Sequence, residues 1–184
     1  AAHRAEQLAY LAGLEHDRAT DPRVGELLAE VEHSDLVSDP LSDAAVNVRE
    51  WRRQYGRQTR LPRPLVEETA RVTSLAQAEW AAARRDADFV RFRPWLERVT
   101  ALKRREAEAV GYTTEPYDAL LDEYEPGATA RDLERLFAVL SEELSELTKR
   151  LAGAPRRPNP GVLRRDYPAE RQRAFGRVAV AALG

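Results

Sequence analysis

The sequence contains no cysteine and no methionine, and only 7% of its 184 residues are aromatic. The absence of cysteine excludes disulfide bonds and thiolate catalysis and is typical of a reducing compartment, so we expect a cytoplasmic protein. No apolar run approaches the roughly 18 residues that a transmembrane helix needs, and no charged-then-apolar leader is present. We therefore expect no membrane partner.

Charge is abundant but evenly balanced along the chain. Charged residues make up 33% of the sequence and hydrophobic residues 43%, which is typical of a globular protein. The 29 basic and 31 acidic side chains are interleaved and give a net charge of −2, so no broad positive field predicts nucleic-acid binding. A weaker, third hypothesis of nucleic-acid association rests on the basic residues with the fewest acidic neighbours, Arg156, Arg157, Arg164 and Arg165.

Sequence motifs for catalysis are also missing. The three histidines, His3, His16 and His33, form no H-x-x-x-H or H-E-x-x-H pattern, and we predict that they are surface polar residues. No G-x-S-x-G motif sets up a serine nucleophile, and the nine glycines are too scattered for a phosphate loop. The residues therefore predict no catalytic and no metal-binding position, and the substrate-binding residues stay unknown.

Apolar residues recur every three to four positions between proline and glycine breaks, which predicts an all-α array of antiparallel amphipathic helices. The expected helices span about residues 1–18, 22–31, 41–57, 65–85, 89–110, 133–151 and 168–182. Asp21 and Pro22 suit a helix start, Thr129 and Asp132 form a capping pair, and Gly111 suits a helix end.

Four apolar sets indicate which faces are buried. The first helix carries a stripe of Ala5, Leu8, Leu11 and Ala12. The leucine repeat, Leu133, Leu136, Leu140, Leu144, Leu147 and Leu151, predicts a buried bundle helix, with a short coiled-coil seam as the alternative. In the last helix Phe175, Val178, Ala179 and Ala182 are predicted to face inward. The three tryptophans, Trp51, Trp80 and Trp95, are expected in the core or at an interface.

The stretch Pro116 to Gly127 has the most unusual order of residues, P-Y-D-A-L-L-D-E-Y-E-P-G. Its helical spacing predicts a buried edge of Tyr117, Leu120 and Leu121. Four carboxylates surround this edge: Asp118, Asp122, Glu123 and Glu125. They could form an acid/base pair or a metal site, but a solvated face is the favoured interpretation, because charge clusters are mostly found in water.

Both ends of the chain lie inside helical patterns. The sequence opens without a cap before Ala1, and it stops at Gly184 just as a helix finishes. We therefore interpret residues 1–184 as a single helical region that is a fragment of a longer catalytic domain. Helices separated from their packing partners would leave an apolar patch, so we also expect self-association.

Seven sequence segments, in order, resemble the N-terminal part of the carboxypeptidase Taq family of thermostable metallocarboxypeptidases. They are residues 4–9, 47–50 with 52–55, 61–62 with 65–67, 76–80, 88–89 with 92–97, 116–127, and 167–168 with 170–172. The resemblance implies a mostly helical, saddle-like and often homodimeric enzyme with a deep groove. Its activity would be the removal of single amino acids from the C-termini of peptide substrates.

The same resemblance implies a zinc or cobalt ion, held by the two histidines of an H-E-x-x-H helix and a downstream glutamate. In the family these residues, and those that bind the substrate carboxylate, follow the region that this chain resembles, so no catalytic or metal role is transferred to any position here. We predict a scaffold and groove-wall portion that is inactive alone. The alternative is a non-enzymatic helical interaction module that has lost the catalytic half.

Overall fold

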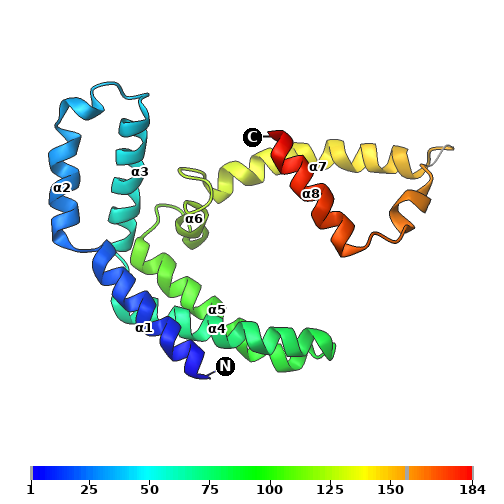
Figure 1. Ribbon diagram of the computed structural model, residues 1–184, viewed down its shortest axis with the longest axis horizontal. Coiled ribbons are helices and arrows are strands. Elements are labelled where there is room, and N and C mark those ends of the chain that lie inside the picture. The colour runs from blue at the N-terminus through cyan, green and yellow to red at the C-terminus, as the bar shows by residue number, and fades with distance from the viewer. Residues whose placement is uncertain (1, 156–157, 184) are drawn as a thin grey trace. The chain divides into compact units, whose positions relative to one another are not determined.

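The computed structural model describes residues 2–155 and 158–183, and no strand occurs among them (Figure 1). Its elements are α1 (Ala2–Ala19), α2 (Pro22–Glu32), η1 (Asp35–Val37), α3 (Asp43–Gln58), α4 (Arg63–Arg85), α5 (Phe89–Val110), α6 (Pro116–Leu121), α7 (Ala130–Ala152), η2 (Pro160–Arg164) and α8 (Ala169–Leu183). The all-α prediction is confirmed. Within the described ranges no helix is long and apolar enough to cross a membrane. The chain divides into two compact units, Ala1–Arg135 and Leu136–Gly184.

The helix starts follow the local sequence signals. The Asp21 side chain accepts a hydrogen bond from the main-chain N–H of Arg23 at 2.9 Å, with Pro22 in the first turn of α2. Before α7, the Thr129 hydroxyl accepts a hydrogen bond from the main-chain N–H of Asp132 at 3.1 Å. Both caps were predicted from residue type and spacing.

The first unit is arranged around α4, against which α1 and α5 pack along their lengths (Figure 1). The face that α1 buries differs from the predicted stripe: it consists of Ala5, Ala9, Gly13 and His16, while Leu8 and Leu11 are exposed. Ala5 is buried and Ala12 half-buried, in agreement with the predicted stripe. The prediction was wrong for Leu8 and Leu11, because it weighed hydrophobicity alone. A face of small side chains lets two helix backbones approach closely, and here that close approach decides the orientation of α1.

The α4–α5 interface holds a core cluster of Leu65, Val72 and Leu102. Trp95 packs against this cluster, as predicted for a core residue, and the Arg98 guanidinium lies over its ring. Trp51 and Trp80 are exposed, so the core prediction was wrong for both. An interface role for Trp51 and Trp80 stays a prediction.

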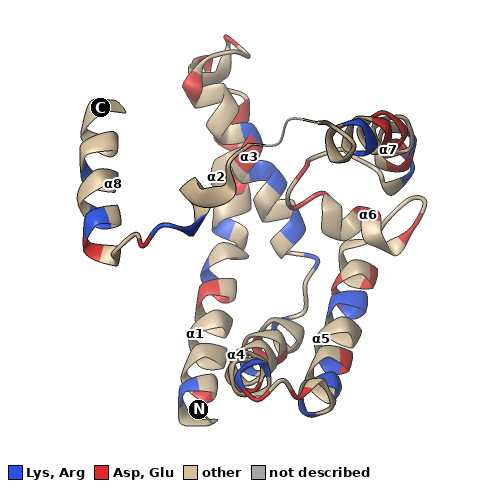
Figure 2. Ribbon diagram, turned by 90° about the vertical axis from the view of Figure 1, so that its right-hand side faces the viewer, with Lys and Arg blue, Asp and Glu red and all other residues tan. Residues whose placement is uncertain are grey.

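Opposite charges alternate along the helices of this unit (Figure 2), and they form ion pairs between neighbouring helices. Arg71 of α4 reaches Glu6 of α1, and Arg105 of α5 reaches Glu68 of α4. Arg52 of α3 donates two hydrogen bonds to Glu32, which lower the pKa of that carboxyl below its usual value. These exposed pairs set the register of adjacent helices more than they stabilise the fold.

The tight turn between α4 and α5 places Ala87 in the left-handed region with φ 52°. An L-residue with a Cβ is strained there, whereas glycine is not. We expect Ala87→Gly to raise the free energy of unfolding by about 0.5 to 1 kcal/mol. Urea titration measures it, with Ala101→Gly in the middle of α5 as the control, which should lower stability by about 1 kcal/mol. An equal loss of unfolding free energy in both variants would contradict the presence of backbone strain at Ala87.

The second unit contains most of α7, with η2 and α8, and its apolar faces are open. Five leucines of the α7 repeat, from Leu136 to Leu151, are 41% to 64% exposed, so the predicted burial was wrong. The inward-facing prediction for α8 was also wrong, since Phe175, Val178 and Ala182 are exposed and Ala179 is half-buried. Amphipathic periodicity shows that a helix has an apolar face, but no described element of this unit covers these two faces.

Candidate functional site

A row of three arginines, at the end of α3 and just after it, lies against the junction between α5 and α6. Arg53 and Arg57 are four residues apart, which places them on one face of α3, and Arg60 follows in the turn just after the helix. They donate hydrogen bonds to main-chain carbonyls: Arg60 to Val110 at 2.9 Å, Arg57 to Ala119 at 2.7 Å, and Arg53 to Asp122 at 3.1 Å. Cations are favourable at these positions because the last carbonyls of a helix lack intrahelical partners.

Arg57 also forms the most enclosed ion pair recorded among the described residues. Its Nη2 lies 2.8 Å from Oε1 of Glu106 in α5, and both side chains are only 12% exposed. Lys103 donates to the other oxygen of Glu106 at 2.7 Å, and Glu123 lies 3.8 Å from Arg57. One guanidinium therefore connects α3, α5, α6 and the segment that follows α6.

Three of the four carboxylates in the Pro116–Gly127 stretch bind main chain or arginine instead of one another. Asp118 accepts a hydrogen bond from the N–H of Ala130 at 2.8 Å, and Asp122 accepts from the N–H of Gly127 at 3.0 Å while pairing with Arg53 at 3.2 Å. Asp118 and Asp122 are half-buried, whereas Glu123 and Glu125 are exposed as a solvated face predicts. No acid/base pair is assembled.

The predicted apolar edge of this stretch is only partly correct. Leu120 and Leu121 are half-buried, but Tyr117 is exposed and Ala119 takes the buried position. Ala119 packs with Ala107 and Val110 at the end of α5. Tyr117 and Ala119 are two residues apart and therefore lie on different sides of α6, and the side with Ala119 faces α5.

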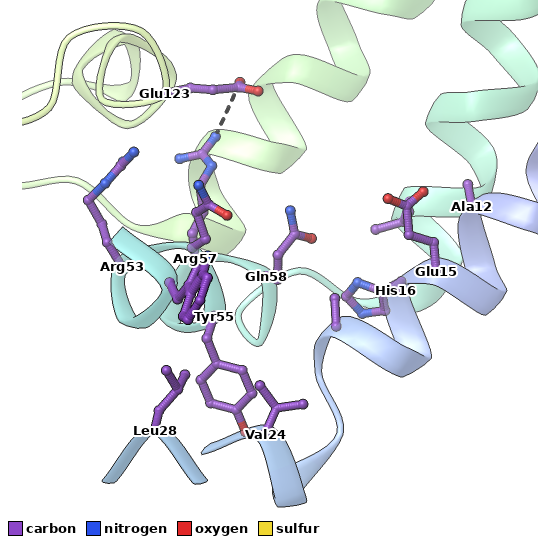
Figure 3. A pocket seen from close by; sticks show the side chains of 14 residues that line it. Ala12, Glu15, His16, Val24, Leu28, Arg53, Tyr55, Arg57, Gln58 and Glu123 are labelled. Carbon is purple, nitrogen blue, oxygen red and sulfur yellow. Dashed lines mark ion pairs between the residues drawn. The ribbon is translucent and has the colours of Figure 1, made fainter. Parts of the chain in front are cut away.

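A pocket of about 630 Å³ lies between α1, α2 and α3 in the first unit. Fourteen residues line it, among them Glu15, His16, Val24, Leu28, Tyr55 and Gln58. In Figure 3 the ring of Tyr55 lies with Val24 and Leu28 at one end, while Arg53, Arg57 and Glu123 lie at the other. The pocket thus has an apolar end and a charged end, a combination typical of small-molecule sites.

The three histidines do not come together. His3 and His33 are exposed, as predicted, and the Nδ1 of His33 lies 2.7 Å from the carbonyl oxygen of Ala29. His16 is only 7% exposed, so the surface prediction was wrong for it. A signal was present in the sequence, because His16 follows Gly13 at helical spacing on the small-residue face of α1. His16 lines the pocket, and its Nδ1 is buried without a hydrogen-bond partner.

No group of histidine, cysteine, aspartate or glutamate side chains that could hold a metal ion occurs in the described ranges. The side chains present therefore do not fit the zinc or cobalt ion that the family resemblance implies. Of the arginines considered for nucleic-acid binding, Arg164 and Arg165 are exposed. Arg156 and Arg157 lie outside the described residues.

Comparison with known proteins gives consistent matches. The sequence pattern of the carboxypeptidase Taq (M32) metallopeptidase family matches residues 1–184. Thermostable carboxypeptidase 1 of Thermus thermophilus is 48% identical over 192 residues, which cover 99% of this chain and 38% of that protein. The crystal structure of BsuCP has a TM-score of 0.82 at 30% identity, over 99% of this chain and 36% of that one.

The structure of a carboxypeptidase from Pyrococcus furiosus has a TM-score of 0.67 at 33% identity, over 76% of this chain and 28% of that one. The chain thus spans 28% to 38% of the length of these relatives, and the neighbouring structures belong to a larger helical fold. Because the family pattern matches along the full sequence, the chain belongs to the carboxypeptidase Taq (M32) metallopeptidase family.

Proposed function

We propose that this chain is the N-terminal scaffold and groove wall of a metal-dependent carboxypeptidase that removes amino acids from the C-termini of peptides. The observation that carries the proposal is the family match over residues 1–184 combined with a span of 36% to 38% of the relatives. On this proposal residues 1–184 form one part of a longer catalytic domain. The reacting centre lies in another part of it.

The metal of the complete enzyme, zinc or cobalt on this proposal, is held outside the part of the chain that the structure describes, where no donor set suits it. A metal supplies Lewis-acid activation in such enzymes. The residues of this chain contribute positioning. The α3 arginines hold α5 and α6 in one arrangement through the Arg57 contacts to Glu106 and Ala119, and a rigid wall keeps a bound peptide oriented.

Two further properties of the complete enzyme belong to the same proposal. We place it in the cytoplasm, which is supported by the absence of cysteine from this chain. We also propose that it is a homodimer. The exposed leucines of α7 support self-association, because a large apolar patch on a folded surface is typical of an interface.

The test of the proposal is release of C-terminal amino acids from a short peptide by the 184-residue chain, with zinc or cobalt added and then with a chelator. We expect no release above the buffer rate with either metal, because the described residues offer no metal-binding group. The full-length protein should release amino acids in a chelator-sensitive manner. Chelator-sensitive release by the 184-residue chain would contradict the assignment of the reacting centre to another part.

A non-enzymatic interaction module is the second candidate. The exposed apolar face of α7, from Leu136 to Leu151, favours it, because such a face can bind a partner helix. The sequence of the gene beyond Gly184 separates the two candidates. An H-E-x-x-H helix there supports the carboxypeptidase, and a gene that ends near Gly184 supports the interaction module.

A further inference from the structure

The polar side chains of the pocket between α1, α2 and α3 fall into two groups. Arg57 and Arg53 are engaged by Glu106, Asp122 and main-chain carbonyls. The side chains of Glu15, Gln54 and Gln58 form no hydrogen bond or ion pair with any described residue, although all three line the pocket. The charged end is thus internally neutralised, and one free carboxylate and two free amides remain available to a ligand.

The buried ring of His16 adds a donor to this set. Its Nδ1 is enclosed without a hydrogen-bond partner, and an enclosed N–H without an acceptor costs more free energy than an enclosed lone pair. We therefore assign the ring proton to Nε2. Nε2 is not among the enclosed unpartnered atoms, and because His16 lines the pocket we assign its N–H as a donor to an acceptor there.

The opposite end of the pocket is apolar. Val24 and Leu28 of α2 lie beside the ring of Tyr55, which packs so closely on α2 that a Cβ at Gly25 would lie 2.7 Å from its hydroxyl (Figure 3). At about 630 Å³ the pocket falls within the usual range for small ligands and has room for a dipeptide. Its walls therefore combine a carboxylate, hydrogen-bond donors that include the His16 ring and the Gln58 amide, and an apolar surface.

We propose that this pocket binds a small zwitterion of the amino-acid type, either a free amino acid with an apolar side chain or a dipeptide. Glu15 takes the ammonium group, the Nε2–H of His16 and the Gln58 amide take the carboxylate, and the side chain packs on Val24 and Leu28. A ligand with a single charge leaves either Glu15 or the donors unpaired, and this mismatch gives the pocket its selectivity. The inference rests on the pocket and not on the proposed carboxypeptidase function.

Calorimetric titration of the 184-residue chain tests the proposal with L-leucine and leucyl-leucine in separate arms. We expect saturable binding of one or both at concentrations up to about 10 mM. Leucinamide, which lacks the carboxylate, and N-acetylleucine, which lacks the ammonium group, should each bind about tenfold more weakly or worse, because each loses a charge-assisted hydrogen bond. Absence of saturable binding in both arms, or equal binding of all four compounds, overturns the proposal.

Three variants locate the site. Glu15→Gln should weaken binding about tenfold, His16→Phe should remove the N–H donor with a similar loss, and Gln58→Leu should reduce affinity several-fold. Glu134→Gln on α7 is the matched control, because Glu134 is exposed, has no partner among described residues and lies outside the pocket. Circular dichroism checks the fold of each variant. If His16→Phe fails to fold, Glu15→Gln and Gln58→Leu decide alone, and unchanged affinity in both overturns the proposal.

Binding is measured here without catalysis, so its outcome is independent of the peptidase assay. Saturable binding without amino-acid release supports the pocket proposal and leaves the proposed function to its own test. Chelator-sensitive release without binding contradicts the pocket proposal alone.

Discussion

Arg57→Met should lower the free energy of unfolding of the Ala1–Arg135 unit by about 3 kcal/mol or more. The substitution keeps an aliphatic chain of similar length but removes the partner of the Glu106 carboxylate, whose side chain is 12% exposed. It also leaves the carbonyl of Ala119 without the guanidinium donor at 2.7 Å. Lys103 still neutralises part of the charge on Glu106. The expected loss of unfolding free energy is therefore at the lower end of the range for breaking an enclosed ion pair.

Urea titration followed by tryptophan fluorescence measures this effect selectively, because Trp51, Trp80 and Trp95 all lie in the first unit. Arg104→Met is the matched control. Arg104 is exposed on α5 and has no partner among the described residues, so its replacement should change stability by less than about 0.5 kcal/mol.

A double variant separates the ion pair from the loss of packing. Combining Arg57→Met with Glu106→Leu removes both charges, so the double variant should lose less stability than the two single variants added together. Simple additivity would mean that the two side chains do not interact energetically. An Arg57→Met variant as stable as Arg104→Met would contradict the role of Arg57 in joining α3, α5 and α6.

Leu102→Ala is the second substitution with a large expected effect. Leu102 is 4% exposed and packs with Leu65 and Val72 at the α4–α5 interface, against Trp95 and Val99. Removing its branched end leaves a cavity in a contact between two long helices, and such replacements cost about 2 to 5 kcal/mol. We expect a loss of about 3 kcal/mol, with a fluorescence change because Trp95 borders the cavity.

Leu41→Ala is the control for the same chemical change, because Leu41 is 85% exposed between η1 and α3. It should alter the free energy of unfolding by less than about 0.5 kcal/mol. A third variant, Leu102→Met, keeps most of the volume and should cost less than about 1.5 kcal/mol. Similar losses for Leu102→Ala and Leu41→Ala would show that the α4–α5 cluster does not hold this unit together.

The positions of the helices were predictable because their signals are local. Proline at a first turn, a capping side chain such as Asp21 and apolar spacing of three to four residues act within one or two turns of the chain. The predicted helix of residues 89–110 matches α5, and the helix predicted from about Leu41 begins at Asp43 in α3. The other predicted helices differ only at their terminal residues, where several conformations have similar energy. The short helices η1 and η2 were not predicted.

The pocket was much less predictable. His16 was expected on the surface, although the small-residue face of α1 formed by Ala5, Ala9 and Gly13 continues to it.

The spacing of Arg53, Arg57 and Arg60 was visible in the sequence, but their acceptors lie on α5, on α6 and just after it, about 50 to 69 residues further along. Such contacts depend on the packing of distant segments, which a single sequence does not encode locally.

The amino-acid sequence by itself determined the helical class, the caps and breaks, the family and the absence of the metal-binding H-E-x-x-H motif. Each of these depends on residue type and short-range order. Only the tertiary structure decided which face of α1 is buried, that Arg57 and Glu106 are paired, and that the leucines of α7 remain open within the described unit. The physical reason is that a helix face is buried only when a second surface packs against it. The periodicity of the sequence defines the apolar face of the helix, whereas the tertiary structure determines whether another element covers that face.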